Sequence, residues 1–280
     1  MTGAGGFVGR HLVARLRGDG WDVVPLTRGS VDLAAAPDAA VAVRAADPDV
    51  VFSLAAARRK GTPAERAATV AVNTSPWLVD ALPSRCRAVV RLGSSTEYAA
   101  APVPLAEDAA LHPRGFFGAT KAAGSLLLQA AAAERGVRSA VLRAFQVYGP
   151  GDHPTRVVPV VLDAARTGAV VPLPRRVSRR DWVWVGDVVD ACVRAALADD
   201  LPAGQVLNIG TGVQTSTEEL VSVASRVTGR PIATAAGAHP GRDWDTDCWV
   251  SDPSLAASLL GWRPTVDLAE GLARTWAASA

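Results

Sequence analysis

Three glycines near the start of the chain limit what it can fold into. Gly3, Gly6 and Gly9 are spaced three apart and lead into an amphipathic stretch at 10–17. Glycine permits a tight turn, a close approach of backbone to a diphosphate, and close packing of a helix on a strand. A helix that begins there presents free N–H groups and its positive dipole end to phosphates. The spacing predicts a dinucleotide-binding loop, with a purely structural turn as the alternative.

Short apolar runs alternate with helical patterns along the first half of the chain. We expect strands at 23–26, 50–54, 88–92 and 139–142, and helices at 37–46, 63–82 and 118–135. This alternation predicts an α/β fold with a doubly wound parallel sheet and right-handed crossovers. The later chain is richer in loops, with helices expected at 157–167, 187–197, 217–228 and 268–278 and a strand at 206–209.

Composition excludes several classes of protein. The formal net charge of +2 does not favour a nucleic-acid or membrane-surface partner. No apolar run is long enough to span a membrane and no leader pattern is present, so we expect a cytoplasmic protein. Cys86, Cys192 and Cys248 are odd in number and far apart, which argues against a disulfide framework or a metal site.

Amines and phenols are scarce in this chain. Its lysines are Lys60 and Lys121, and its tyrosines are Tyr98 and Tyr148. Chemistry that needs an amine or a phenol must therefore use one of these four side chains.

The glycine loop, Thr-Gly-Ala-Gly-Gly-Phe-Val-Gly, resembles the TGxxGxxG signature of the extended short-chain dehydrogenases/reductases, the NAD(P)-dependent sugar-nucleotide epimerase/dehydratase family. Further segments resemble that family in the same order, at 52–56, 72–74, 93–98, 143–150, 180–187 and 242–264. The resemblance implies a Rossmann domain at 1–150 and a small, mainly substrate-binding C-terminal domain at 151–280, with later segments returning to the first sheet. It also implies a nucleotide-sugar substrate and a homodimer.

One departure from the family concerns the N-terminus. The chain reaches its glycine loop after a single residue, so we expect the first strand of the sheet to be truncated.

The resemblance also implies which residues contact the cofactor. Arg28 follows the second expected strand, where an acidic residue would bind a ribose 2′-hydroxyl and an Arg suits a 2′-phosphate. This favours NADP(H), with NAD(H) possible and a solvated surface Arg28 as the alternative. Asp32 and Leu33 resemble the family's adenine-contacting pair. The other implied cofactor contacts are Gly3, Gly6, Phe7, Val8, Gly9, Leu54, Ala55, Ala56, Asn73, Lys121 and Val147.

Catalysis in the family uses a Ser or Thr and a Tyr-x-x-x-Lys pattern. The Tyr exchanges a proton with the substrate oxygen, and the Lys lowers the phenol pKa and holds the ribose. Here Phe117 stands where the Tyr belongs, Lys121 is retained, and Ser95, with Thr96 beside it, is placed to bind a carbonyl oxygen.

Phe117 cannot donate a proton, so another group must replace the phenol. The substitutes within reach along the sequence are Thr96, Tyr98, His112, Thr120 or a water. We expect Tyr98 to pack as a loop aromatic and Glu97 to be an exposed loop carboxylate.

The substrate side is implied by arginines. By resemblance, Arg180 and Arg242 clamp the nucleotide diphosphate, because guanidinium groups offer paired donors to phosphate oxygens. Gln146 occupies a ligand-contacting position, and Ser95 is also expected to touch the sugar. Arg175 and Arg176 extend the basic stretch, with a solvated surface run as the alternative.

These observations predict NAD(P)H-dependent reduction of a nucleotide-linked ketosugar of the 4-keto-6-deoxyhexose type. Reduction tolerates the loss of the Tyr best, because it needs one proton and no base. The first alternative is a 4-epimerase or dehydratase that uses tightly bound NAD. The second is a non-catalytic protein that binds nucleotides or nucleotide sugars.

Overall fold

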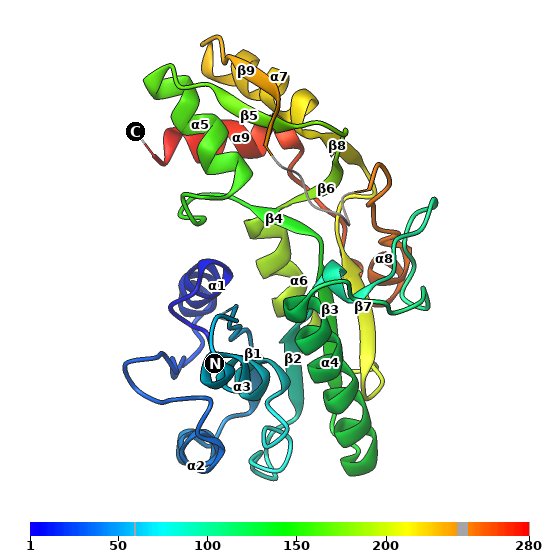
Figure 1. Cartoon of the computed structure of the whole chain (residues 1–280). Coiled ribbons are helices and arrows are strands. Elements are labelled where there is room, and N and C mark those ends of the chain that lie inside the picture. The colour runs from blue at the N-terminus through cyan, green and yellow to red at the C-terminus, as the bar shows by residue number, and fades with distance from the viewer. Residues whose placement is uncertain (59, 240–245, 280) are drawn as a thin grey trace.

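The computed structural model describes residues 1–58, 60–239 and 246–279 (Figure 1). In this view the chain forms a lower part, which holds the N-terminus and a parallel sheet, and an upper part, which holds the C-terminus. Among the described residues, no helix has the length and hydropathy needed to cross a membrane.

A parallel sheet organises the lower part. Its strands, in spatial order, are β1 (Val50–Ser53), β2 (Ala88–Leu92), β3 (Ser139–Ala144) and β7 (Gln205–Ile209). The helices of this part are α1 (Phe7–Gly18), α2 (Ala36–Ala46), α3 (Pro63–Thr74), α4 (Phe116–Arg135) and α6 (Val185–Leu197). Because neighbouring strands are parallel, each connection must cross over the sheet, and α3 and α4 make two of these crossovers.

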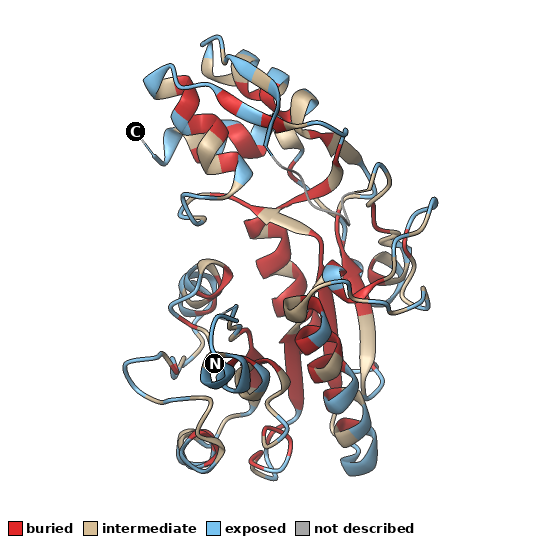
Figure 2. Ribbon diagram, viewed as in Figure 1, coloured by how far each residue is buried: buried red, intermediate tan, exposed pale blue. Residues whose placement is uncertain are grey.

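Alternate side chains of the strands enter two different cores, and buried residues line both sides of the sheet (Figure 2). Phe52 and Val90 pack in the cluster that contains the apolar residues of α1 and α6. Val51 and Val89 pack in a second cluster, which contains residues of α2 and Leu128 of α4. Successive strand residues point to opposite faces, so covering both faces requires continuous apolar runs. The prediction of a doubly wound parallel sheet is confirmed.

The upper part consists of two small sheets and their helices. One sheet has the order β4 (Gln146–Tyr148), β6 (Arg179–Trp184) and β8 (Gln214–Ser216), and the other pairs β5 (Val171–Pro174) with β9 (Thr234–His239). The helices after β4 in this part are α5 (Val157–Thr167), α7 (Thr217–Thr228) and α9 (Leu268–Ala277), while α8 (Ser254–Leu260) packs beside β7.

Phe145 alone separates β3 from β4, so the carboxyl end of the parallel sheet leads directly into the upper part. In open α/β sheets, ligands bind outside the carboxyl ends of the strands. β7 and α6 come from beyond residue 150 yet lie in the lower part. The division of the chain at residue 150 stays a prediction.

Two expected elements are shorter in the structure. Leu26 forms a single bridge with Thr2, in place of a strand over 23–26, and Thr2 also bridges Ser53. Two residues of backbone are too short a partner for a longer ladder. Helix α3 ends at Thr74 and not near residue 82, because Ser75 takes a left-handed conformation with φ of 43° and Pro76 follows it.

Glu97 fixes the loop that follows β2. It ends the short 3₁₀ helix η1 (Ser95–Glu97), is fully buried, and places Oε2 2.9 Å from Nε of Arg143 on β3. Its Oε1 accepts hydrogen bonds from the backbone N–H of Ser94 at 2.9 Å and from the hydroxyl of Ser125 on α4 at 3.0 Å. The expectation of an exposed Glu97 is wrong, because its carboxylate turns inward to these three partners.

Replacing Glu97 with Gln should lower the free energy of unfolding by about 3–5 kcal/mol, because Arg143 would stay buried without its partner charge. Urea unfolding followed by tryptophan fluorescence measures this loss.

Glu219→Gln is the matched control. Glu219 occupies the same position of a capping box, with Ser216, but its ion pair with Arg179 is exposed. That substitution should cost less than about 1 kcal/mol. Equal losses in the two variants would contradict the role given to the buried pair.

Candidate active site

The glycine loop packs against backbone with no room for side chains. Gly3 has φ of +70°, and a Cβ on it would lie 2.5 Å from the backbone nitrogen of Ala55. A Cβ on Gly9 would lie 2.1 Å from the carbonyl oxygen of Gly3. Gly6 is the N-cap of α1, and no side chain among the described residues caps that helix. The first-turn N–H groups of α1 therefore remain available to an anion.

The other predicted cofactor residues near this loop have different environments. Val8 and Leu54 are buried, Ala55 is half-buried and Ala56 is exposed. The ring of Phe7 meets His11 edge to face. Ala55 and Ala56 lie beside the glycine loop, where β1 ends, so this set of residues is brought together.

Asn73 is wholly occupied by bonds within the protein. Its Nδ2 donates to the carbonyl of Ala57 at 2.9 Å and to the hydroxyl of Thr120 at 2.8 Å, and its Oδ1 accepts from the N–H of Ala57 at 2.7 Å. Asn73 thus ties the loop after β1 to α4, so it shapes the site through the loop that it holds.

The residues predicted to contact the adenosine end of the cofactor lie on a turn after Leu26. Ser30 closes this turn by accepting from the N–H of Thr27 at 2.9 Å. Arg28 and Asp32 are exposed and Leu33 is half-buried. The carboxylate of Asp32 accepts from the N–H of Ala34, so it orders the turn.

The serine loop presents two hydroxyls and buries a third. The hydroxyls of Ser94 and Thr96 are 2.8 Å apart, and either can be the donor. Ser95, in contrast, is 6% exposed, and its oxygen accepts from the indole Nε1 of Trp249 at 3.1 Å. Thr96 is exposed and Ser94 is half-buried, which makes this pair the accessible part of the loop.

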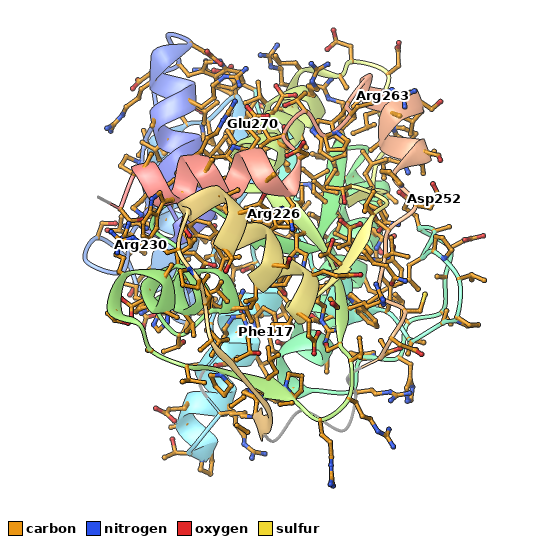
Figure 3. The ribbon with its side chains drawn as sticks, turned by 90° about the horizontal axis from the view of Figure 1, so that it is seen from above. Phe117, Arg226, Arg230, Asp252, Arg263 and Glu270 are labelled. Carbon is orange, nitrogen blue, oxygen red and sulfur yellow. The ribbon has the colours of Figure 1, made fainter. Side chains whose placement is uncertain are left out.

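Helix α4 begins against this loop and contains Phe117, the residue aligned by resemblance with the family's Tyr. A Cβ on Gly118 would lie 2.3 Å from the carbonyl oxygen of Thr96, so only glycine allows the two segments to come so close. In a view from above, Phe117 lies toward the middle of the molecule, while Asp252 and Arg263 lie toward its edge (Figure 3). The guanidinium of Arg58 stacks on the Phe117 ring, 3.9 Å from the ring centre.

Lys121 lies one turn beyond Phe117 and is 3% exposed, which excludes a solvated helix lysine. Its ammonium group donates to the carbonyl of Leu92, at the end of β2. Burial is the main cause that lowers the pKa of Lys121 to about 7; the charge of Arg91 lowers it too, Glu97 opposes this and Arg58 adds to it. The amine can therefore gain or lose a proton near neutral pH.

Three of the expected substitutes for the phenol are unsuited to the role. Tyr98 is buried, as expected, and donates to Asn208 at 2.7 Å, and burial raises the pKa of its phenol to about 12. The hydroxyl of Thr120 donates to the carbonyl of Phe117 at 2.9 Å while accepting from Asn73. His112 is exposed on the loop before α4. Thr96 is the fourth of these expected substitutes, and its hydroxyl is accessible.

The substrate-side residues come from β4 and β6. Gln146 pairs with Trp182, and both Gln146 and Val147 are half-buried at the junction of the two parts. Arg180 is half-buried and donates to the carbonyl of Arg179 at 2.6 Å. Arg175 and Arg176 are exposed. Arg242 lies outside the described residues.

Comparison with known proteins agrees with this geometry. The pattern of the NAD dependent epimerase/dehydratase family matches residues 1–210. The chain is 33% identical to a UDP-glucose 4-epimerase of Mycolicibacterium smegmatis, over 98% of this chain and 96% of that protein. It is 30% identical to dTDP-6-deoxy-L-talose 4-dehydrogenase (NAD(P)(+)) of Kitasatospora kifunensis, over 99% and 94%.

A solved structure supports the same assignment. MoeE5 in complex with UDP-glucose and NAD matches with a TM-score of 0.86 and 30% identity, covering 99% of this chain and 97% of that one. The chain belongs to the NAD-dependent epimerase/dehydratase family. It is an enzyme of the extended short-chain dehydrogenase/reductase type, as its sequence predicts.

Sequence reasoning on this family member missed three residues of the site. They are Ser94, Arg91 and Arg58. A charged residue in the otherwise apolar run of β2 was the available signal for Arg91. Nothing in the sequence signals that Arg58 stacks on Phe117, 59 positions along the chain.

The low pKa of Lys121 predicts a pH dependence of stability. In the folded chain the amine loses its proton near pH 7, whereas the unfolded chain keeps it to about pH 10.4. The unfolded state binds more protons between these values, so the free energy of unfolding should rise with pH there. In Lys121→Met this rise should be smaller by about 1 kcal/mol per pH unit.

Urea unfolding at several pH values between about 7.5 and 9 measures these slopes. Lys60→Met is the control, because Lys60 is exposed and its loss should leave the wild-type slope. A common slope for all three proteins would show that Lys121 is not held neutral in the folded state.

Proposed function

We propose that this enzyme reduces a nucleotide-linked 4-ketosugar with a nicotinamide dinucleotide. One observation carries the proposal: Phe117 lies one helical turn before the buried Lys121, and by the resemblance we assign Phe117 to the position of the family's proton-exchanging phenol. Oxidation of a sugar alcohol must begin with a base that removes the hydroxyl proton, and Phe117 offers none. Reduction needs one proton for the new hydroxyl, which other groups of the site can supply.

The residues present fit a dinucleotide. Gly3 and Gly9 let the loop pack tightly on the backbone, and the uncapped N-terminus of α1 offers its N–H groups to a diphosphate. A bound nicotinamide supplies the hydride for the sugar carbon. Gly3, Gly6 and Gly9 would hold the diphosphate and Lys121 the adjoining ribose. The relatives above, one with NAD in its solved structure, support this assignment.

The remaining side chains bind and orient the sugar in this proposal. Ser94 and Thr96 hydrogen-bond the ketone oxygen, and Ser95 supports them through its bond to Trp249. The ring of Phe117 excludes water from one side of the sugar. Gln146 and Arg180, at the junction of the two parts, hold the nucleotide end, and Arg242 joins them as a further proposed diphosphate contact.

A 4-epimerase is the second candidate. The observation in its favour is similarity to a UDP-glucose 4-epimerase and to a structure that holds UDP-glucose with NAD. The similarity to a 4-dehydrogenase of a 6-deoxysugar favours the reductase. Phe117 weighs against epimerisation, because that reaction begins by oxidising the sugar hydroxyl.

Turnover distinguishes the two candidates. With a dTDP- or UDP-linked 4-keto-6-deoxyhexose, a reductase consumes NADPH or NADH in proportion to the sugar, whereas an epimerase interconverts UDP-glucose and UDP-galactose with no net consumption. Phe117→Tyr should raise the rate of ketosugar reduction about tenfold or more, because a phenol beside Lys121 is a well-placed acid.

Phe116→Tyr is the control for an added hydroxyl, since its ring is the neighbouring one on α4. It should leave the reduction rate near that of the native enzyme. If neither native enzyme nor Phe117→Tyr oxidises a reduced nicotinamide or interconverts UDP-glucose and UDP-galactose, although both bind nucleotide sugar, the protein is the non-catalytic binder.

Arg28 supports a second proposal, a preference for NADP(H) over NAD(H). Arg28→Ala should weaken NADPH binding about 10- to 100-fold, the loss of a charged hydrogen bond, and should leave NADH binding unchanged. Calorimetric titration with both cofactors measures this. Arg44→Ala, an equally exposed arginine on α2, is the control. Tighter binding of NADH than NADPH by the native protein would end the proposal.

A further inference from the structure

The source of the proton is the open chemical question at this site, and answering it rests on the proposed reduction. Tyr98 and Thr120 are engaged in internal hydrogen bonds, and Phe117 has no acidic proton. The nearby groups that can carry one are the hydroxyl pair of Ser94 and Thr96 and the amine of Lys121. A hydroxyl can pass a proton on, but its own pKa is too high for it to be the source.

Lys121 and the hydroxyl pair lie at the same end of β2. The Lys121 amine bonds to the carbonyl of Leu92, which is two residues before Ser94. Gly118 holds the first turn of α4 against the carbonyl of Thr96. Since the Ser94 and Thr96 oxygens are 2.8 Å apart and either can donate, the pair can accept a proton at one oxygen and release one from the other.

Arg91 places a positive charge near Lys121, against α4. It is 2% exposed, and its guanidinium donates to the carbonyl of Asn73 on α3. A Cβ on Gly124, three residues beyond Lys121, would lie 2.1 Å from Nη2 of Arg91, so the guanidinium lies against this face of α4. Among the described residues, Nε of Arg91 has no hydrogen-bond partner and no carboxylate pairs with the side chain.

The charges that face Lys121 come from three segments. Arg91 belongs to β2, Arg58 to the loop after β1 and Glu97 to η1, and Glu97 pairs with Arg143 of β3. Glu97 is the one carboxylate in this group and is already shared with Arg143. The surplus of positive charge favours the neutral amine, and burial acts in the same direction.

We propose that Lys121 is the proton donor to the sugar oxygen, with the Ser94–Thr96 hydroxyl pair as the relay, and that Arg91, packed against the same face of α4, is a positioning residue whose charge acts together with burial to make the Lys121 proton transferable. Lys121 thereby takes over the role of the phenol that Phe117 lacks.

The step balances as follows. The ketone carbon receives a hydride from a reduced nicotinamide dinucleotide, and the C=O π electrons move to oxygen. That oxygen takes a proton from one hydroxyl of the pair, and the pair is refilled as an N–H bond of the Lys121 ammonium breaks. Lys121 is left as a neutral amine, which solvent reprotonates before the next turnover.

Lysine labelling gives a test that needs no cofactor and no activity. With lysine ¹³C-labelled at Cε, the chain shows two lysine signals, from Lys60 and Lys121, and Lys121→Met assigns them. Lys121 should titrate near pH 7. In Arg91→Met, the Lys121 midpoint should move up by about one pH unit or more, while Lys60 stays unchanged.

Arg91→Lys keeps the charge and should restore the low midpoint. Tryptophan fluorescence checks that each variant is folded. If Arg91→Met does not fold, the native midpoint and the Arg91→Lys midpoint decide. The proposal is overturned if Lys121 of the native protein titrates above about pH 9. It is also overturned if the Lys121 midpoint is the same with and without a charge at position 91.

Reduction kinetics then test the proton transfer, with ketosugar and cofactor saturating. The rate should fall as pH rises through the Lys121 midpoint, and in Arg91→Met this fall should move upward with the NMR midpoint. Ser94→Ala and Thr96→Val should lower kcat at least tenfold without moving the Lys121 titration.

Failure of this inference and failure of the proposed function give different results. Reduction whose pH profile does not follow the Lys121 titration overturns this inference and leaves the proposed function standing. Absence of reduction with every ketosugar at every pH overturns both.

Discussion

The buried contact between Glu97 and Arg143 holds together the elements from which the candidate active site is built. Glu97 ends the turn after β2, Arg143 lies on β3, and Ser125, which donates to the same carboxylate, lies on α4. The carboxylate also accepts from the backbone of Ser94. A buried charge is costly without its partner, so this loop, strand and helix are stable only in one mutual arrangement. The positions of the serine loop and of Lys121 follow from it.

Positive charge then accumulates around Lys121. Arg58 and Arg91 approach this region, and Glu97, which pairs with Arg143, is the carboxylate that opposes them. In the free protein these charges disfavour a protonated amine. These charges thus act together with burial on the protonation of Lys121.

In the proposed assignment, Phe117 lets the family fold keep its architecture while its chemistry changes. The ring needs only the close approach of α4 to the serine loop, which Gly118 provides. A hydroxyl at this position, which we propose that the family uses, would contribute to the reaction and not to the packing, so its absence would leave the scaffold intact. Fold and family are therefore secure guides to the ligands, while the reaction depends on individual side chains. The homodimer stays a prediction.

Local physics determined what could be derived from the sequence. The spacing of Gly3, Gly6 and Gly9, the apolar runs of the strands and the scarcity of lysine predicted the loop, the parallel sheet and the importance of Lys121. These features depend on backbone conformation and on short-range periodicity, which a sequence displays directly. What the sequence misjudged were boundaries, as where Ser75 turns left-handed and ends α3.

The tertiary structure decided which polar groups are exposed and which are engaged in hydrogen bonds or ion pairs within the protein. Ser95 is unavailable because Trp249, 154 residues away, donates to it, and Glu97 is buried because Arg143, 46 residues away, meets it. Arg58 and Arg91 join the site only because the sheet brings β1, β2 and α4 together. Sequence order carries no distance between such partners. Their charge and hydrogen bonding, and hence the protonation of Lys121, are properties of the folded chain alone.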